Sequence, residues 1–292
     1  MKIALYGKPY LNSLNQNIEP IIEAVRKAGL ELEVYEKYFR FLKSENLIKD
    51  DFATFNRKDV SIDQYACLVS IGGDGTLLDT VTIVGDSGVP VVGINAGRLG
   101  FISSISVEEI EPVLKSVVEE NFICDERSLL SVETKNKLYG DFNYALNELT
   151  VHKKDTASMI KINAFLDDEF LNAYWADGLI ISSPTGSTAY NMSCGGPIVL
   201  PGSENFVITP IAPHNLNVRP AVVSNDSKIR LTVEGRSDEY LIALDSRTET
   251  IHRNEEVIIS KAPFTFKLIK PESHSFISTM RNKLGWGLDK RN

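Results

Sequence analysis

The sequence predicts a two-lobed protein, with an α/β amino-terminal lobe built on a parallel sheet and a mainly-β carboxy-terminal lobe. Its 292 residues, 43% of them hydrophobic, are enough for two domains with sizeable cores. Strand-like and helix-like stretches alternate up to roughly Cys124, a βαβ rhythm that implies parallel strands with right-handed crossovers. Beyond Cys124, short β-branched segments lie between turn residues. We expect lobes at 1–124, completed by 271–292, and at 125–270.

Each element of the first lobe follows from the spacing of apolar residues. Asn17–Ala28 has isoleucine and valine at helical spacing and is followed by Gly29, a common residue at helix ends. Tyr65–Ile71 is almost wholly apolar, as a central strand covered on both faces should be. The other expected strands are Lys2–Tyr6, Glu31–Tyr35 and Pro90–Ile94, and the other expected helical regions are Phe39–Phe52, Leu77–Val84 and Val107–Glu119.

The second lobe is expected to consist of strands, because its segments alternate or run apolar and contain few helical periods. These segments are Leu129–Thr134, Asn143–His152, Ile160–Leu166, Gly178–Ser182, Lys228–Glu234 and Tyr240–Leu244. The closing stretch Thr279–Trp286 regains helical character and is expected to join the first lobe.

Composition narrows the classes of function. The formal net charge is -8 and there is no basic tract, which argues against a nucleic-acid or anionic-membrane surface. No apolar run reaches the roughly 18 residues that span a bilayer, and the first apolar run ends at Gly7, so it indicates a strand. The three cysteines are far apart, as expected of reduced thiols in the cytoplasm, and the histidines lack zinc-ligand spacing. We therefore expect a cytoplasmic protein without nucleic-acid or membrane partners.

The most informative motif is the glycine-rich turn Gly72–Thr76, in which Asp74 lies between glycines. A buried strand ends there and a helix begins, so backbone N–H groups at the edge of a parallel sheet can bind phosphate. A carboxylate among such donors is explained if Asp74 accepts the proton of a substrate hydroxyl. The alternative is a structural turn in which the aspartate caps the helix. Neither the Walker A pattern nor Gly-x-Gly-x-x-Gly is present.

Three weaker segments accompany this turn. Asn95 and Arg98 follow the fourth strand and are expected at the same sheet edge, where Arg98 either holds phosphate or is an ordinary solvated arginine. Asp177–Asn191 runs from a strand into a loop rich in hydroxyl residues, suited to ribose and base contacts or simply to a turn. The pair Asn147-Glu148 is uninformative alone. The predicted phosphate-binding residues are Gly72, Gly73, Gly75, Thr76, Asn95 and Arg98.

In this fixed order, the segments resemble the NAD kinase family over nearly the whole chain. The resemblance rests on the glycine-rich turn, on Gly93–Phe101, on Asn147-Glu148 and on the Asp177–Tyr190 segment. Later motifs that fit are Pro210–His214, Arg219-Pro220 and the ending Arg281–Trp286. It implies the NAD kinase/diacylglycerol kinase-like fold, with the two lobes already expected.

The resemblance also implies an activity: phosphoryl transfer from ATP or another donor to the 2′-hydroxyl of the adenosine ribose of NAD, giving NADP. It implies a divalent cation, Mg²⁺, with ligands that the sequence does not identify, and a homodimer or homotetramer. Asp74 would be the general base. The residues that the resemblance places at the dinucleotide are Asp74, Gly75, Asn147, Glu148, Asp177, Thr188, Ala189, Tyr190, Asn191, Met192, Ser193 and Ala212.

Two positions depart from the family pattern. Asp245-Ser246-Arg247 stands where relatives often have Asp-Gly-Gln, and Trp175 where many bacterial members have arginine. The alternative functions are a lipid kinase of the diacylglycerol or sphingosine type, which shares the glycine-rich turn, and a dinucleotide sensor without catalysis. The acidic chain argues against the first of these, and the intact Asp74 argues against the second.

Overall fold

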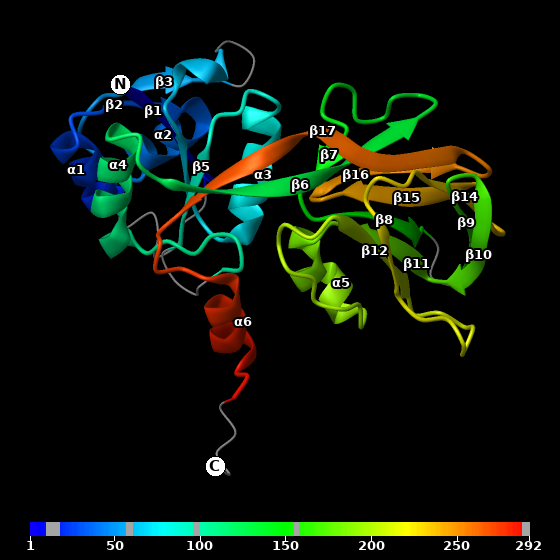
Figure 1. Cartoon of the computed structure of the whole chain (residues 1–292). Helices are drawn as coiled ribbons and strands as arrows, with labels where there is room; N and C mark the ends of the chain where they lie inside the picture. Colours follow the sequence, from blue (N-terminus) through cyan, green and yellow to red (C-terminus); the bar gives the residue numbers. More distant parts are fainter. Residues whose placement is uncertain (10–17, 57–60, 96–99, 155–157, 288–292) are drawn as a thin grey trace. The chain divides into compact units, whose positions relative to one another are not determined.

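The computed structural model describes residues 1–9, 18–56, 61–95, 100–154 and 158–287. The chain divides into two compact units, Met1–Glu126 with Phe266–Asn292 (unit 1) and Arg127–Thr265 (unit 2). Figure 1 labels their helices and strands. Within the part of the chain that the structure describes, no helix is long and apolar enough to cross a membrane.

Unit 1 contains the parallel sheet that the sequence predicts. Its strand order is β17-β5-β4-β1-β2-β3, and every neighbouring pair is parallel. The bounds are β1 Lys2–Gly7, β2 Glu31–Tyr35, β3 Ala53–Phe55, β4 Leu68–Ile71, β5 Val91–Ile94 and β17 Glu256–Lys270. Only the end of β17, at Leu268 and Ile269, pairs with β5. Chain order reverses between β1 and β4, and Gly7, Ile71 and Ile94 are aligned across the sheet. Ligands in open α/β sheets bind at the carboxyl ends of strands beside such a reversal.

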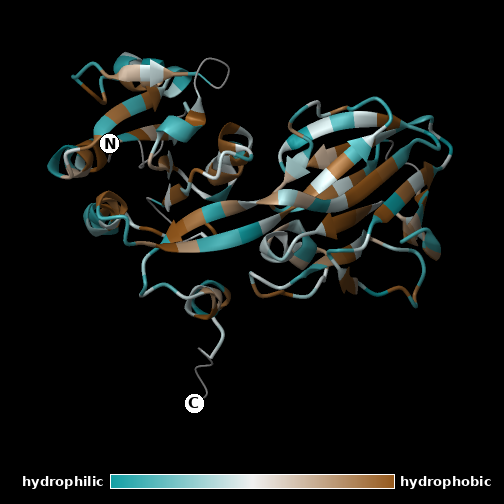
Figure 2. Ribbon diagram, turned by 45° about the horizontal axis from the view of Figure 1, so that its top comes forward, coloured by the Kyte–Doolittle hydropathy of each residue, from teal (hydrophilic) through white to brown (hydrophobic). Residues whose placement is uncertain are grey.

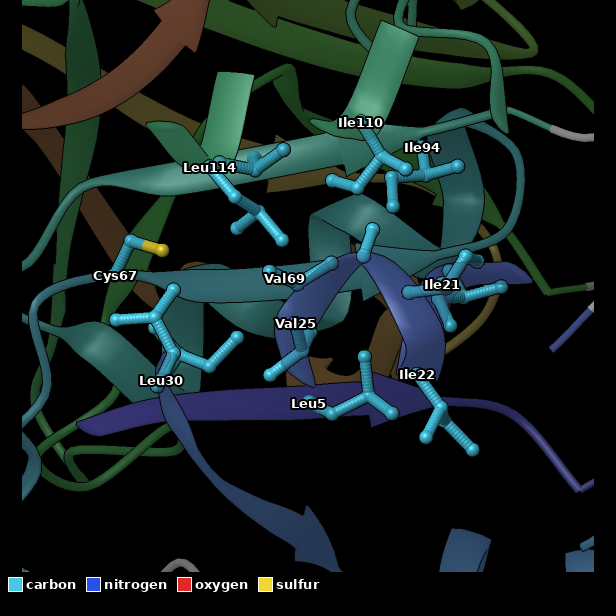
Figure 3. Packing of buried hydrophobic residues seen from close by; sticks show 14 of the residues in the cluster. Leu5, Ile21, Ile22, Val25, Leu30, Cys67, Val69, Ile94, Ile110 and Leu114 are labelled. Carbon is cyan, nitrogen blue, oxygen red and sulfur yellow. The ribbon is translucent and has the colours of Figure 1, made fainter. Parts of the chain in front are cut away.

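Helices pack on this sheet through apolar faces. They are α1 Ile18–Lys27, α2 Glu36–Ser44, α3 Asp74–Val84 and α4 Ile110–Val118, with short 3₁₀ turns at Ile62–Gln64 and Val107–Glu109. The last helix of unit 1, α6 Phe276–Leu284, buries only Thr279, and its Phe276 ring lies 6.4 Å from the ring of Phe101. Figure 3 shows Ile21, Ile22 and Val25 of α1 directed toward Leu5 and Val69 on the strands. The predicted helical spacing is therefore confirmed for α1, and α3 begins at Asp74, within the glycine-rich turn.

Unit 2 is a mainly-β unit with two layers of strands around one core. One sheet has the antiparallel order β13-β12-β11-β8-β15-β16, and the other contains β10-β9-β14 and the first part of β17, with β6 and β7 beside it. Inward-facing residues of both sheets form a single apolar cluster. Figure 2 shows hydrophobic and hydrophilic residues alternating along these strands, as expected when one face is buried.

The bounds in unit 2 are β6 Ile123–Thr134, β7 Tyr144–Ala145, β8 Glu148–Lys153, β9 Ile160–Leu166, β10 Glu169–Ala176, β11 Gly178–Ser182, β12 Asn205–Ile211, β13 Ala221–Ser224, β14 Ile229–Glu234, β15 Glu239–Leu244 and β16 Arg247–His252. A 3₁₀ turn, Thr185–Thr188, and the one-turn helix α5, Tyr190–Ser193, follow β11. The predicted fold class, an α/β lobe with a parallel sheet and a mainly-β lobe, is confirmed.

Candidate functional site

The glycine-rich turn lies at the carboxyl end of β4 in unit 1. Gly73 is the N-cap of α3, and Asp74 is the first helical residue. A Cβ on Gly72 would lie 2.2 Å from Thr76 Oγ1, so the tight turn requires glycine there. A Cβ on Gly73 or Gly75 would meet no atom of the described residues within 4 Å, so an anion has room to approach the turn there. The Gly72 N–H donates to Ile94 O at 3.0 Å and the Thr76 N–H to Gly73 O at 2.9 Å, so these two predicted phosphate-binding residues use their N–H groups within the protein.

The Asp74 carboxylate binds the loop that follows β5. It accepts the backbone N–H groups of Phe101 at 2.9 Å, Ile102 at 3.2 Å and Ser103 at 2.9 Å. Gly73 is the N-cap of α3, and the Asp74 carboxylate binds N–H groups of another loop, so the aspartate does not cap the helix. Asp74 instead holds a second loop against the turn, which Ser103 strengthens by donating its hydroxyl to Gly72 O at 2.9 Å.

A lysine that sequence reasoning missed also lies at this edge. Lys8 follows β1, and its Nζ is 3.0 Å from Gly75 O and 2.9 Å from Asp79 Oδ2. The Tyr6 hydroxyl donates to the same Asp79 oxygen at 3.0 Å. The available signal was the position of Lys8, directly after a parallel strand whose carboxyl end shares the edge of the sheet.

The other predicted phosphate-binding residues have different placements. Asn95 directly follows β5; its N–H donates to Ile105 O at 2.7 Å and its side-chain amide to Ser103 O at 3.2 Å, so it supports the loop that Asp74 anchors. Thr76 is buried in the first turn of α3. Arg98 lies outside the residues that the structure describes.

In unit 2, Asn147 and Glu148 lie where β7 gives way to β8. Asn147 is 6% exposed, and the segment after β11 is fastened to its backbone: the Ser183 N–H donates to Asn147 O at 2.9 Å. Among the residues that the structure describes, the buried Asn147 Oδ1 and Glu148 Oε2 atoms have no hydrogen-bond partner. Buried polar atoms are rarely left unsatisfied, so this pair is suited to a polar ligand.

The electrostatics of Glu148 follow from its surroundings. Burial, and secondly the nearby Asp245 carboxylate, raise the pKa of Glu148 to about 8. Its carboxyl group is therefore largely protonated at neutral pH and can donate a hydrogen bond.

Asp177 lies beside this strand pair in the same sheet. Its carboxylate is 2.6 Å from Lys153 Nζ, and its N–H donates to Ile211 O at 3.0 Å. Ala212, the next residue after that carbonyl, is exposed and has φ +45°. Asp177 and Ala212 are thus brought together by pairing of β11 with β12.

The Thr188–Ser193 segment divides into exposed and buried members. Tyr190 and Ser193 are exposed, and Ala189 and Met192 are partly exposed. Asn191 is fully buried: its amide donates to Ser187 O at 2.9 Å and Pro197 O at 3.0 Å, and accepts from Thr209 Oγ1 at 2.6 Å. Thr188, also buried, donates its hydroxyl to Thr185 O. Asn191 therefore shapes the loop from within.

The two departures from the family pattern have defined positions. Trp175 is 46% exposed on β10 and accepts the His214 N–H at its carbonyl, 2.8 Å away. Asp245 lies in the β15–β16 turn and accepts the N–H groups of Leu146, Asn147 and Glu148. Sequence reasoning missed this supporting role of Asp245.

Comparison with known proteins adds a class and a family. Residues 31–122 match the family model of the ATP-NAD kinase N-terminal domain, and residues 146–271 match that of the ATP-NAD kinase C-terminal domain. Together with an α/β lobe that carries a glycine-rich turn at its sheet edge, these matches define the class of protein. The chain is a kinase, that is, a phosphotransferase.

Full-length relatives give the family itself. The chain is 45% identical over 294 residues to an NAD kinase of Flavobacterium johnsoniae and 43% identical over 297 residues to one of Christiangramia forsetii, with 100% of both chains covered in each case. The chain belongs to the NAD kinase family.

Solved structures agree in fold. A yeast NADH kinase complexed with NADH superposes with a TM-score of 0.85 at 22% identity, covering 99% of this chain and 88% of that one. An NAD kinase from Archaeoglobus fulgidus in complex with ATP gives 0.73 at 27% identity, with 98% of both chains covered.

Proposed function

We propose that the protein transfers the terminal phosphoryl group of ATP to the 2′-hydroxyl of the adenosine ribose of NAD, giving NADP, and that Asp74 receives the hydroxyl proton. The observation that carries this proposal is the placement of Asp74 at the start of α3, among open glycine N–H groups beside the reversal of strand order. Family membership supports NAD as the acceptor, and the ATP complex of the Archaeoglobus relative supports ATP as the donor.

Asp74 has capacity for one further hydrogen bond. A carboxylate offers about four lone-pair positions, and three backbone N–H groups occupy three of them. The remaining position accepts the substrate hydroxyl, while the anchored loop fixes its direction. Asp74 acts first by orienting the hydroxyl and takes the proton as phosphoryl transfer proceeds.

The divalent cation would enter the site bound to the phosphates of the donor, ATP. Within the described ranges no group of three or more His, Cys, Asp or Glu side chains is arranged to hold a metal. Mg²⁺ is commonly bound by substrate phosphates with only one or two carboxylates and several waters. Mg·ATP as the substrate therefore fits the few carboxylates available here, and the N–H groups of Gly73 and Gly75 together with Lys8 would bind its phosphates.

Unit 2 would supply recognition of the dinucleotide. The buried, unpartnered atoms of Asn147 and Glu148 call for a ligand with hydroxyl or amine groups, which ribose and adenine both carry. Asp177, Ala212 and the exposed Tyr190 lie on the same sheet or at its edge. Other members of the predicted set, Gly75, Thr188, Ala189, Asn191, Met192 and Ser193, belong to this proposal as contacts or as supports for them.

One assay tests the activity. Purified protein is incubated with Mg·ATP and NAD, and NADP is measured with an NADP-specific dehydrogenase, with NADH, diacylglycerol and sphingosine as alternative acceptors. NADP formation from NAD supports the proposal. Phosphorylation of a lipid without NADP would establish the lipid-kinase alternative, and NAD binding without turnover under any donor would establish a sensor. Sedimentation of the same sample tests the predicted homodimer or homotetramer.

A further inference from the structure

The β15–β16 turn is tied closely to the segment that carries Asn147 and Glu148. Asp245 has φ +51°, a left-handed conformation that aspartate tolerates in two-residue hairpin turns. Its Oδ2 accepts the Leu146 N–H at 2.9 Å, and its Oδ1 accepts those of Asn147 at 2.9 Å and Glu148 at 3.2 Å. The Asp245 N–H in turn donates to Glu148 O at 3.0 Å.

Arg247 extends this attachment along the same segment. Its guanidinium donates to the carbonyl oxygens of Phe142 and Tyr144 and lies 5.7 Å from the centre of the Tyr139 ring. Acceptor atoms of Asp245 therefore hold N–H groups, and donor atoms of Arg247 hold carbonyl groups, of one continuous stretch, 142–148. Asp245 matches the first residue of the family's Asp-Gly-Gln pattern, and the departure at Arg247 adds contacts within the protein to the same segment.

These contacts fix the backbone of Asn147 and Glu148, the two residues whose Oδ1 and Oε2 atoms lack a partner within the described part of the chain. Three consecutive N–H groups that converge on one carboxylate set the backbone of Leu146–Glu148, and with it the direction of the Asn147 and Glu148 side chains. Asn147 Oδ1 and Glu148 Oε2 stay buried and unsatisfied in this arrangement. A ligand contact that depends on two such atoms is sensitive to displacements of about 1 Å, which can cost about 100-fold.

We propose that Asp245 is a positioning residue: it holds Asn147 and Glu148 in the orientation that binds the dinucleotide, without touching the dinucleotide itself. The proposal rests on the proposed function for the identity of the ligand. It predicts that loss of the Asp245 charge weakens binding of NAD while leaving the handling of ATP unchanged, since the three N–H groups that its carboxylate accepts all belong to unit 2.

The pH dependence of NAD binding distinguishes a positioning role of Asp245 from a role in stabilising the fold alone. Besides burial, the Asp245 carboxylate from the β15–β16 turn raises the pKa of Glu148, and Glu148 in turn raises the pKa values of Tyr190 in α5 and of Cys194 directly after it. Removing the negative charge of Asp245 lowers the pKa of Glu148, so the upper pH limit of NAD binding moves to lower pH. A residue that only stabilised the turn would not shift this limit.

The test compares the full-length wild type with Asp245→Asn, and with Asp167→Asn as the matched control. Asp167 also lies in a hairpin turn, has φ +50° and accepts a backbone N–H, that of Lys228 at 2.8 Å, but it is on the β9–β10 turn. We expect KM for NAD and the calorimetric Kd of NAD to rise about 10- to 100-fold in Asp245→Asn, with KM for ATP within about twofold of wild type. Asp167→Asn should change none of them.

Three outcomes overturn the inference: an unchanged NAD affinity in Asp245→Asn, an equal rise in both KM values, or the same loss in Asp167→Asn. If Asp245→Asn does not fold, Arg247→Ala decides, since it removes the two carbonyl contacts; an unchanged KM for NAD there also overturns the inference. Wild-type protein that makes no NADP contradicts the proposed function instead, and wild-type protein that does not bind NAD in the calorimeter contradicts both.

Discussion

Gly100→Ala gives the sharpest test of how the glycine-rich turn is built. A Cβ at this position would lie 2.1 Å from Asp74 Oδ1 and 2.7 Å from Ser103 O, whereas real Cβ contacts under 3.0 Å are essentially never seen. The carboxylate and the loop must therefore separate by about 1 Å, which stretches the hydrogen bonds from Phe101, Ile102 and Ser103, now 2.9–3.2 Å, beyond bonding range.

The cost can be worked from those bonds. Hydrogen bonds to a charged group contribute about 1.5–3 kcal/mol each and are not additive, so the variant should lose about 2–4 kcal/mol of folding stability. A displaced Asp74 should also lower kcat about 100-fold. Denaturant unfolding and the NADP assay measure the two effects, with Gly235→Ala as the control.

The control places a methyl group where its nearest neighbour is Tyr240 Oη at 3.0 Å, in unit 2. We expect it to cost less than about 1 kcal/mol and to leave kcat unchanged. If Gly100→Ala matches wild type in both stability and kcat, the loop does not press on Asp74 in solution, and the anchoring role assigned to this carboxylate is wrong.

Three further predictions concern single side chains. Asp74→Asn should lower kcat about 10²–10⁴-fold with NAD affinity little changed, measured by initial rates and calorimetry; wild-type kcat would exclude Asp74 as the base. Lys8→Met should raise KM for ATP about tenfold and leave KM for NAD unchanged, because its ammonium lies at the phosphate edge; equal effects on both would contradict this placement. The pKa of Glu148 is raised from 4.5 to about 8, so the native state binds the extra proton and stability falls as pH rises through that window. Glu148→Gln should flatten this fall in pH-dependent denaturation curves, and an unchanged slope would assign it to another group.

The fold class was predictable because apolar periodicity is a strong local signal. The four expected parallel strands and the helix in α1 lie within a few residues of their predicted ends. The short strand β3 and the length of β6 and β17 were not foreseen. β3 has only three residues, polar residues interrupt the apolar ones of β6 and β17, and nothing local fixes where pairing stops. The expected helical region Phe39–Phe52 is instead α2, Glu36–Ser44, because the chain turns at Asn46 with φ +55°.

Less of the candidate site than of the fold could be predicted from the sequence. The motif indicated that Asp74 is special, but the three N–H groups that it binds come from residues 101–103, which no spacing rule connects to it. Asp245 is 97–99 residues away from the N–H groups it accepts, so only the folded chain reveals the contact. Lys8 needed the register between β1 and β4, a long-range property.

Asp74 and Asp245 have the same structural role, each in its own unit. Each accepts three consecutive backbone N–H groups from a neighbouring loop, one at the glycine-rich turn and one at Asn147-Glu148. An ionised carboxylate suits this task because it only accepts hydrogen bonds, whereas an asparagine in its place would direct its NH₂ group at one of the donors. Three donors also offset much of the carboxylate's charge, so an aspartate beside a phosphate-binding turn is less repulsive than its formal charge implies. The carboxylate that looked out of place among phosphate donors therefore has two uses: it holds the loop that shapes the turn, and its last free lone pair remains for a substrate hydroxyl.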